Sequence, residues 1–166
     1  MRQEISAGII AYRKTKEGPK FLILYHGHDY WNFAKGKIES EERSLAAAFR
    51  ETREETGLTP RDLRLAQDFK VYERFSFRRN GQPVFKSVIF YLAETDIETV
   101  KISSEHQGYG WFLYREARKI LGRYRDSQRV LRQAFEFLRQ KRYGAAARPG
   151  TPAPGPAASE QKTARE

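Results

Sequence analysis

Three glutamates crowd one side of a predicted helix in the first third of the chain. With successive residues about 100° apart on a helical wheel, Glu51, Glu54 and Glu55 fall within an arc of roughly 100°. Carboxylates one helical turn apart repel one another. A divalent cation removes that cost, and hard cations such as Mg²⁺ take oxygen ligands. The spacing therefore predicts a site for Mg²⁺, or for Mn²⁺ in its place.

The helix that must position these glutamates has its own boundary signals. Ser40 is a suitable N-cap, and Glu41 and Glu42 would then lie in the first turn, where the helix dipole favours anions. Gly57 is placed to end the helix in the left-handed conformation. A core-facing stripe occupies the neighbouring arc: Leu45, Ala48, Phe49 and Thr52.

Residues 36–58, GKIESEERSLAAAFRETREETGL, resemble the sequence box of the Nudix hydrolases at every charged and glycine position. The resemblance extends over residues 4–142, and Thr52 replaces the usual aliphatic residue. It implies an α/β fold, the Nudix α/β/α sandwich with a mixed central sheet. Gly36 lets the backbone approach phosphate oxygens closely, and Lys35 could supply a point charge to the same phosphates, although it could also be an ordinary surface lysine.

The remaining patterns predict strands on both sides of this helix and a second helix near the end of the fold. Asn80-Gly81 is a strong hairpin signal. Apolar residues recur at helical spacing over residues 126–142. The predicted strands cover residues 5–12, 21–25, 64–77, 84–93 and 108–113.

Composition sets the domain organisation and the broad class. Of 166 residues, 1–143 are expected to form one Nudix hydrolase domain, and 144–166 an Ala/Pro/Gly-rich disordered tail. There is no cysteine, no apolar run long enough to span a membrane and no signal-peptide pattern, so we expect a cytoplasmic protein without membrane contact. We also expect it to be a monomer.

The charge balance points to an anionic substrate. The formal net charge is +10, although the predicted site helix is acidic. Residues 115–142 carry ten Lys or Arg against three acidic residues. This stripe could contact RNA, or it could simply be the solvated outer face of a helix.

Three further segments resemble the asymmetrical diadenosine tetraphosphate hydrolases within the Nudix family. Residues 103–111, SSEHQGYGW, resemble their SxEHQxYxW stretch, and residues 31–36, WNFAKG, resemble WxxPKG with Ala34 in place of proline. Residues 83–92, PVFKSVIFYL, resemble the strand with their phosphate-binding lysine. The resemblance implies that Glu105 is a fourth carboxylate at the metal site and that Lys86 binds phosphate.

Other residues are candidates for contacts with the nucleoside and the phosphates. Phe75 and Tyr109 could stack on adenine, because every base offers a π-face, or they could belong to the core. His26 lies in a Gly-containing loop, where it could bind phosphate or be an ordinary loop residue.

The predicted reaction is hydrolysis of diadenosine tetraphosphate to ATP and AMP by water attack at phosphorus. Glu54 is the predicted general base, Glu105 is its competitor, and Arg50 would orient the metal-binding glutamates. Two other interpretations stay open. One is an RNA 5′-pyrophosphohydrolase, which uses the same helix on the 5′ end of RNA. The other is a nucleotide-binding regulator with little catalysis.

Overall fold

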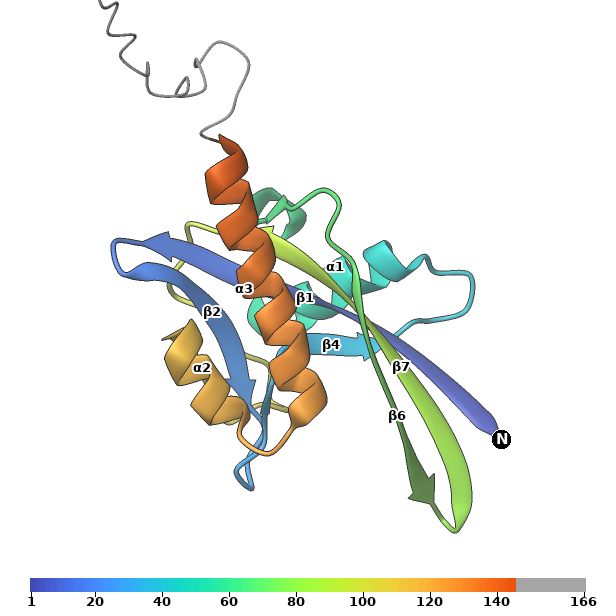
Figure 1. Ribbon diagram of the computed structural model, residues 1–166. Helices are drawn as coiled ribbons and strands as arrows, with labels where there is room; N and C mark the ends of the chain where they lie inside the picture. The colour runs from blue at the N-terminus through green and yellow to red at the C-terminus, as the bar shows by residue number, and fades with distance from the viewer. Residues whose placement is uncertain (146–166) are drawn as a thin grey trace, which may run out of the picture.

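A computed structural model describes residues 1–145, and strand β1 (Arg2–Thr15) forms the centre of its mixed sheet (Figure 1). One edge of β1 pairs in parallel with β7 (Gln82–Glu94). The other edge pairs antiparallel with β4 (Ala34–Lys37) at Ser6 to Ile9, and with β2 (Gly18–Tyr25) from Tyr12 onward. Because β1 changes partner along this edge, the sheet divides there into two branches.

Shorter strands extend the sheet on both sides of β1. On the β2 side lie β3 (Trp31–Asn32) and β8 (Gly108–Leu113), which both pair with β2. On the β7 side lie β5 (Arg64–Leu65) and β6 (Val71–Arg79), which both pair with β7. The helical elements of the described residues are α1 (Ser44–Thr56), a short 3₁₀ turn (Pro60–Asp62), α2 (Tyr114–Leu121) and α3 (Arg125–Ala145).

Two buried clusters hold the layers together, one on each face of the sheet. Phe33, Phe90 and Leu131 belong to the cluster beneath α2 and α3. Leu24 and Ala48 belong to the cluster beneath α1. Figure 1 shows α3 in front of β1 and α1 behind it. The arrangement confirms the predicted α/β/α sandwich, and it explains why residues 6–12 are buried without interruption.

Helix α1 begins later than predicted and ends where predicted. The N-cap assignment of Ser40 is wrong, because the helix starts at Ser44. Glu41 lies between them with φ of 65°, in the left-handed region, which a right-handed helix cannot include. At the other end Gly57 has φ of 75°, and its N–H donates to the carbonyl of Arg53 over 2.8 Å. The predicted left-handed end is confirmed.

The predicted strand at residues 64–77 is two strands, and this part of the prediction is wrong. A turn separates β5 from β6, and Asp68 in that turn has φ of 65°. The hairpin at Asn80-Gly81 is confirmed: the φ angles are 51° and 76°, and Arg79 pairs directly with Gln82.

Helix α2 was not predicted, whereas α3 was. α2 follows β8 without a gap, and the side chain of Leu113 provides no N-cap hydrogen bond, so the usual start signal is missing. α3 extends to Ala145, two residues into the segment predicted as a tail. The rest of that tail, residues 146–166, lies outside the described residues. No helix of the described part of the chain has the length and apolar character needed to cross a membrane.

Gly8→Ala should lower the free energy of unfolding by about 2 kcal/mol, because overpacking displaces backbone. A Cβ atom at Gly8 would lie 2.2 Å from the carbonyl oxygen of Ala34 in β4. Gly108→Ala is the matched control, since its Cβ would lie 3.8 Å from that of Tyr25, an ordinary contact. Denaturant unfolding of both variants is the measurement, and equal stabilities would contradict the close approach of β1 and β4.

Candidate active site

The two inner glutamates of α1 face the backbone of β4. A Cβ atom on Gly36 would lie 2.0 Å from the carboxyl carbon of Glu51, so only glycine leaves room for this side chain. The N–H of Lys35 donates a 3.0 Å hydrogen bond to Oε2 of Glu55. The side chains of Glu51 and Glu55 are 15% and 11% exposed, whereas that of Glu54 is 53% exposed. The helix therefore offers two nearly buried carboxylates and one open to solvent.

Arg50 links these carboxylates to the loop before the helix. Its Nε and Nη2 atoms donate to the two oxygens of Glu42 over 2.7 and 3.0 Å. Its Nη1 atom donates to Glu51 over 2.8 Å and to Glu54 over 3.3 Å. Glu42, predicted to lie in the first helical turn, instead precedes the helix and anchors Arg50. A planar guanidinium with this many partners holds the glutamates at fixed angles.

Glu51, Glu54, Glu55 and Glu105 form one electrostatic group, called the carboxylate cluster below. Burial, together with the charges of Glu51 and Glu105, raises the pKa of Glu55 to about 8, against the lowering effect of the hydrogen bond from the N–H of Lys35. Burial also raises the pKa of Glu51, with Glu54 and Glu105 adding to the rise and Arg50 opposing it. The charges therefore destabilise one another across the cluster.

The carboxylate cluster fits a hard divalent cation in its donor chemistry. Within residues 1–145, no three Asp, Glu or His side chains converge closely enough to form a complete metal site. The donors available are all carboxylate oxygens, partly desolvated and mutually repelling, and a divalent cation would stabilise their anionic forms.

The loop that carries Glu105 is fastened to the end of α1. The N–H groups of Lys101 and Ser103 donate to the carbonyls of Thr56 and Glu55 over 3.0 and 3.2 Å. Glu105 itself is exposed. These backbone contacts hold Glu105 near α1, although some 50 residues separate it from Glu55 in the sequence.

Lys35 and Lys86 project from the same face of the sheet. Lys35 lies opposite Gly8 of β1, and Lys86 lies opposite Glu4 of the same strand. Gly8 and Glu4 are an even number of residues apart, so their strand partners face the same side of the sheet. Burial lowers the pKa of Lys86, and the charge of Lys35 lowers it further. Two half-buried ammonium groups that interact with each other are suited to an anionic ligand.

Glu73 of β6 belongs to the same region and was not identified from the sequence. It is 6% exposed, and its Oε1 accepts a 3.3 Å hydrogen bond from the hydroxyl of Ser127. Burial lowers the pKa of Lys35, and Glu73 is the foremost acidic group opposing this shift. The sequence does carry a signal for this position, because every second residue of a strand faces the same side. Glu73 shares the inward side of the strand with Val71 and Phe75.

The predicted nucleoside contacts are divided between the two faces of the sheet. Phe75 is half-buried opposite Lys86 on the α3 face. Tyr109 packs into the cluster beneath α1, and its hydroxyl accepts a 3.2 Å hydrogen bond from the N–H of Val100. Burial lowers the pKa of His26 to about 4, so its imidazole is neutral at pH 7. The structure thus brings Phe75 to Lys86, while the roles of Tyr109 and His26 stay predictions.

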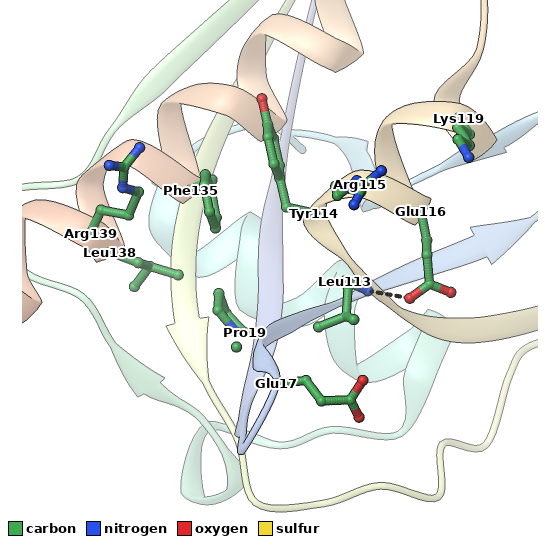
Figure 2. A pocket seen from close by; sticks show the side chains of 11 residues that line it. Glu17, Pro19, Leu113, Tyr114, Arg115, Glu116, Lys119, Phe135, Leu138 and Arg139 are labelled. Atoms are coloured by element: carbon green, nitrogen blue, oxygen red, sulfur yellow. Dashed lines mark hydrogen bonds between the residues drawn. The ribbon is translucent and has the colours of Figure 1, made fainter.

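A cavity of about 610 Å³ lies apart from these residues, between the β1–β2 turn and helices α2 and α3 (Figure 2). Pro19, Leu113 and Leu138 contribute apolar surface to it. The rings of Tyr114 and Phe135 stack on its wall with centroids 4.2 Å apart. None of the predicted site residues lines this cavity.

Comparison with known proteins identifies the family of the chain. The NUDIX domain family matches residues 2–134. An asymmetrical bis(5′-nucleosyl)-tetraphosphatase of Caenorhabditis elegans is 34% identical over 137 residues, covering 80% of this chain and 95% of the relative. An RNA pyrophosphohydrolase of Hydrogenovibrio crunogenus is 31% identical over 113 residues, covering 60% of this chain and 68% of the relative. The crystal structure of a binary complex of a C. elegans Ap4A hydrolase aligns with a TM-score of 0.73 at 31% identity, covering 82% and 98% of the two chains.

The chain therefore belongs to the Nudix family. The chain is a pyrophosphohydrolase, so the prediction that it is an enzyme is confirmed in preference to a nucleotide-binding regulator. The sequence resemblance to the tetraphosphatases is confirmed as well.

Arg50→Lys should lower turnover under saturating Mg²⁺ by about 10- to 100-fold, because lysine cannot hold Glu42 and Glu51 together. Arg53→Lys is the matched control, since Arg53 is exposed on the same helix. Steady-state kinetics and melting temperatures of both variants are the measurements. Equal turnover in the two variants would show that the Arg50 contacts do not organise the site.

Proposed function

We propose that this protein hydrolyses dinucleoside polyphosphates in a reaction that depends on Mg²⁺, with Mn²⁺ able to substitute. Diadenosine tetraphosphate would give ATP and AMP. The observation that carries this proposal is the electrostatic interaction between the carboxylate cluster and two half-buried lysines: Glu51 and Glu55 act on Lys35, and Lys35 acts on Lys86. The carboxylates suit metal ions, and the lysines suit a polyphosphate chain. The name of the C. elegans relative supports the same substrate.

Glu51, Glu54, Glu55 and Glu105 would hold the metal. When bound, a divalent cation neutralises phosphate charge and lowers the pKa of water. Glu54 is our choice of general base, because its carboxylate is the most open to solvent of the three on α1. Glu105 is the competing base, since it is also exposed.

The substrate would lie against β4 and β7. Gly36 and Lys35 would receive phosphate oxygens at the start of the loop before α1, and Lys86 would bind the chain further along. Phe75 is well placed to stack on a base, since it neighbours Lys86 across the strands. Tyr109 and His26 are proposed as further contacts.

The position of the broken bond follows from two fixed points. Stacking holds one adenosine, and the carboxylate cluster stays at a set distance from it. The phosphate chain between them is therefore aligned so that one phosphorus meets the attacking water.

An RNA 5′-pyrophosphohydrolase is the second candidate, and a specific observation favours it. Helices α2 and α3 and the turn between them present exposed cations, which would suit an RNA backbone. The H. crunogenus relative supports the same alternative. The exposed cations are Arg115, Arg118, Lys119, Arg123, Arg125, Arg132, Arg139 and Lys141.

Glu54→Gln should lower the catalytic rate by at least about 100-fold, because it removes a proton acceptor but keeps the shape of the side chain. Glu136→Gln on α3 is the control, since it makes the same change on an exposed glutamate of another helix. Rates are compared under saturating Mg²⁺. A loss below tenfold would reject Glu54 as the base, and Glu105→Gln would then be measured in the same way.

Diadenosine tetraphosphate should yield ATP and AMP in equal amounts, because the gripped half leaves as ATP. In ¹⁸O-labelled water, the label should appear in AMP. Chromatography and mass spectrometry of an early time point measure both. Two ADP molecules as the main products would contradict the asymmetrical assignment. No turnover, together with rapid pyrophosphate release from triphosphorylated RNA, would replace it with the second candidate.

A further inference from the structure

His106 is a buried histidine beside the carboxylate cluster to which the proposed reaction gives no role. Its side chain is only 1% exposed. The imidazole packs against the ring of His26, with centroids 4.5 Å apart. It directly follows Glu105 in the loop that the N–H of Ser103 fastens to the carbonyl of Glu55.

The two ring nitrogens of His106 have different surroundings. Nδ1 lies 2.8 Å from the hydroxyl oxygen of Ser103, within hydrogen-bond range. Nε2 is buried, and it has no hydrogen-bond partner among the described residues. It lies 4.0 Å from Oε2 of Glu55. One nitrogen is therefore fixed by the loop, and the other faces a carboxylate of the cluster.

These surroundings select one tautomer of His106. The buried ring has one hydrogen-bond partner among the described residues, the hydroxyl of Ser103 at Nδ1. A neutral imidazole carries one N–H. When Glu55 is a carboxylate, as it must be to bind a metal, a lone pair on Nε2 would face its negative charge, whereas an Nε2–H would attract it. The hydroxyl of Ser103 then donates to Nδ1.

We propose that His106 is a positioning residue that holds Glu55 through its Nε2–H, and that Ser103 fixes the required tautomer. The inference rests on the proposed function, in which Glu55 binds a metal. Oε2 of Glu55 would be held by the N–H of Lys35 on β4 and by His106 from the loop. That leaves Oε1 for the ion. At 4.0 Å the N–H attracts the carboxylate as a dipole, and a shift of about 1 Å would complete a hydrogen bond.

Mn²⁺ affinity tests this proposal without relying on turnover. The full chain is titrated with Mn²⁺, and the concentration of free Mn²⁺ is measured by electron paramagnetic resonance. His106→Phe keeps a planar ring but loses the N–H, and it should weaken Mn²⁺ binding by about 10- to 100-fold, as loss of an outer contact to a metal ligand does. His106→Gln keeps an N–H donor near the Nε2 position and should restore most of the affinity.

A serine pair keeps the test decisive if His106→Phe does not fold. Ser103→Ala should weaken Mn²⁺ binding by about tenfold, because the tautomer is no longer fixed. Ser104→Ala is the matched control, since Ser104 is exposed in the same loop, and its affinity should equal that of the unmodified protein. Equal affinities for the Ser103→Ala and Ser104→Ala variants would overturn the proposal.

The tautomer has a direct readout in ¹⁵N NMR of the histidine rings. Under saturating Mg²⁺, the unmodified protein should show His106 protonated at Nε2, and Ser103→Ala should show a mixture. Protonation at Nδ1 in the unmodified protein would overturn the proposal. If that protein fails to bind Mn²⁺, the proposed metal site itself is rejected. If it binds Mn²⁺ and the His106 and Ser103 variants bind equally well, only the role of His106 is rejected.

Discussion

The site depends on keeping two carboxylates of one helix nearly buried against the backbone of a neighbouring strand. Glu51 fits only because Gly36 has no side chain, and Glu55 is held by the N–H of Lys35. This contact fixes α1 on β4, and the pairing of β4 with β1 fixes both on the central strand. The fold therefore holds together two carboxylates that would otherwise repel each other and move apart.

Charge compensation explains the parts that surround α1. Arg50 neutralises part of the carboxylate cluster from the side of the loop. Lys35 and Lys86 lie on the face of the sheet toward α3, where a polyphosphate would meet them. Glu73 is buried on the same face, and its charge opposes the lowering of the pKa of Lys35. Each buried charge thus has an opposite charge near it. A metal ion would neutralise the remaining negative charge of the carboxylate cluster, and an anionic substrate would neutralise the remaining positive charge of the lysines.

Local patterns predicted much of this arrangement, whereas contacts between distant segments could not be predicted. The helical spacing of the glutamates, the end at Gly57 and the hairpin at Asn80 are local features, and the structure has them. The start at Ser40 was wrong because the backbone at Glu41 is left-handed, which no residue pattern there indicates. The division of the sheet at β1, the short helix α2 and the buried position of Glu73 all depend on which segments pair.

Diffraction from crystals of the protein grown or soaked with Mn²⁺ tests the central claim most directly. Anomalous scattering locates the ion without assuming its position. We expect an anomalous peak bound by oxygens of Glu51 and Glu55, with Glu54 or Glu105 completing the protein ligands. Well-ordered crystals with no peak between α1 and the loop of Glu105, or with Mn²⁺ bound only elsewhere, would contradict it.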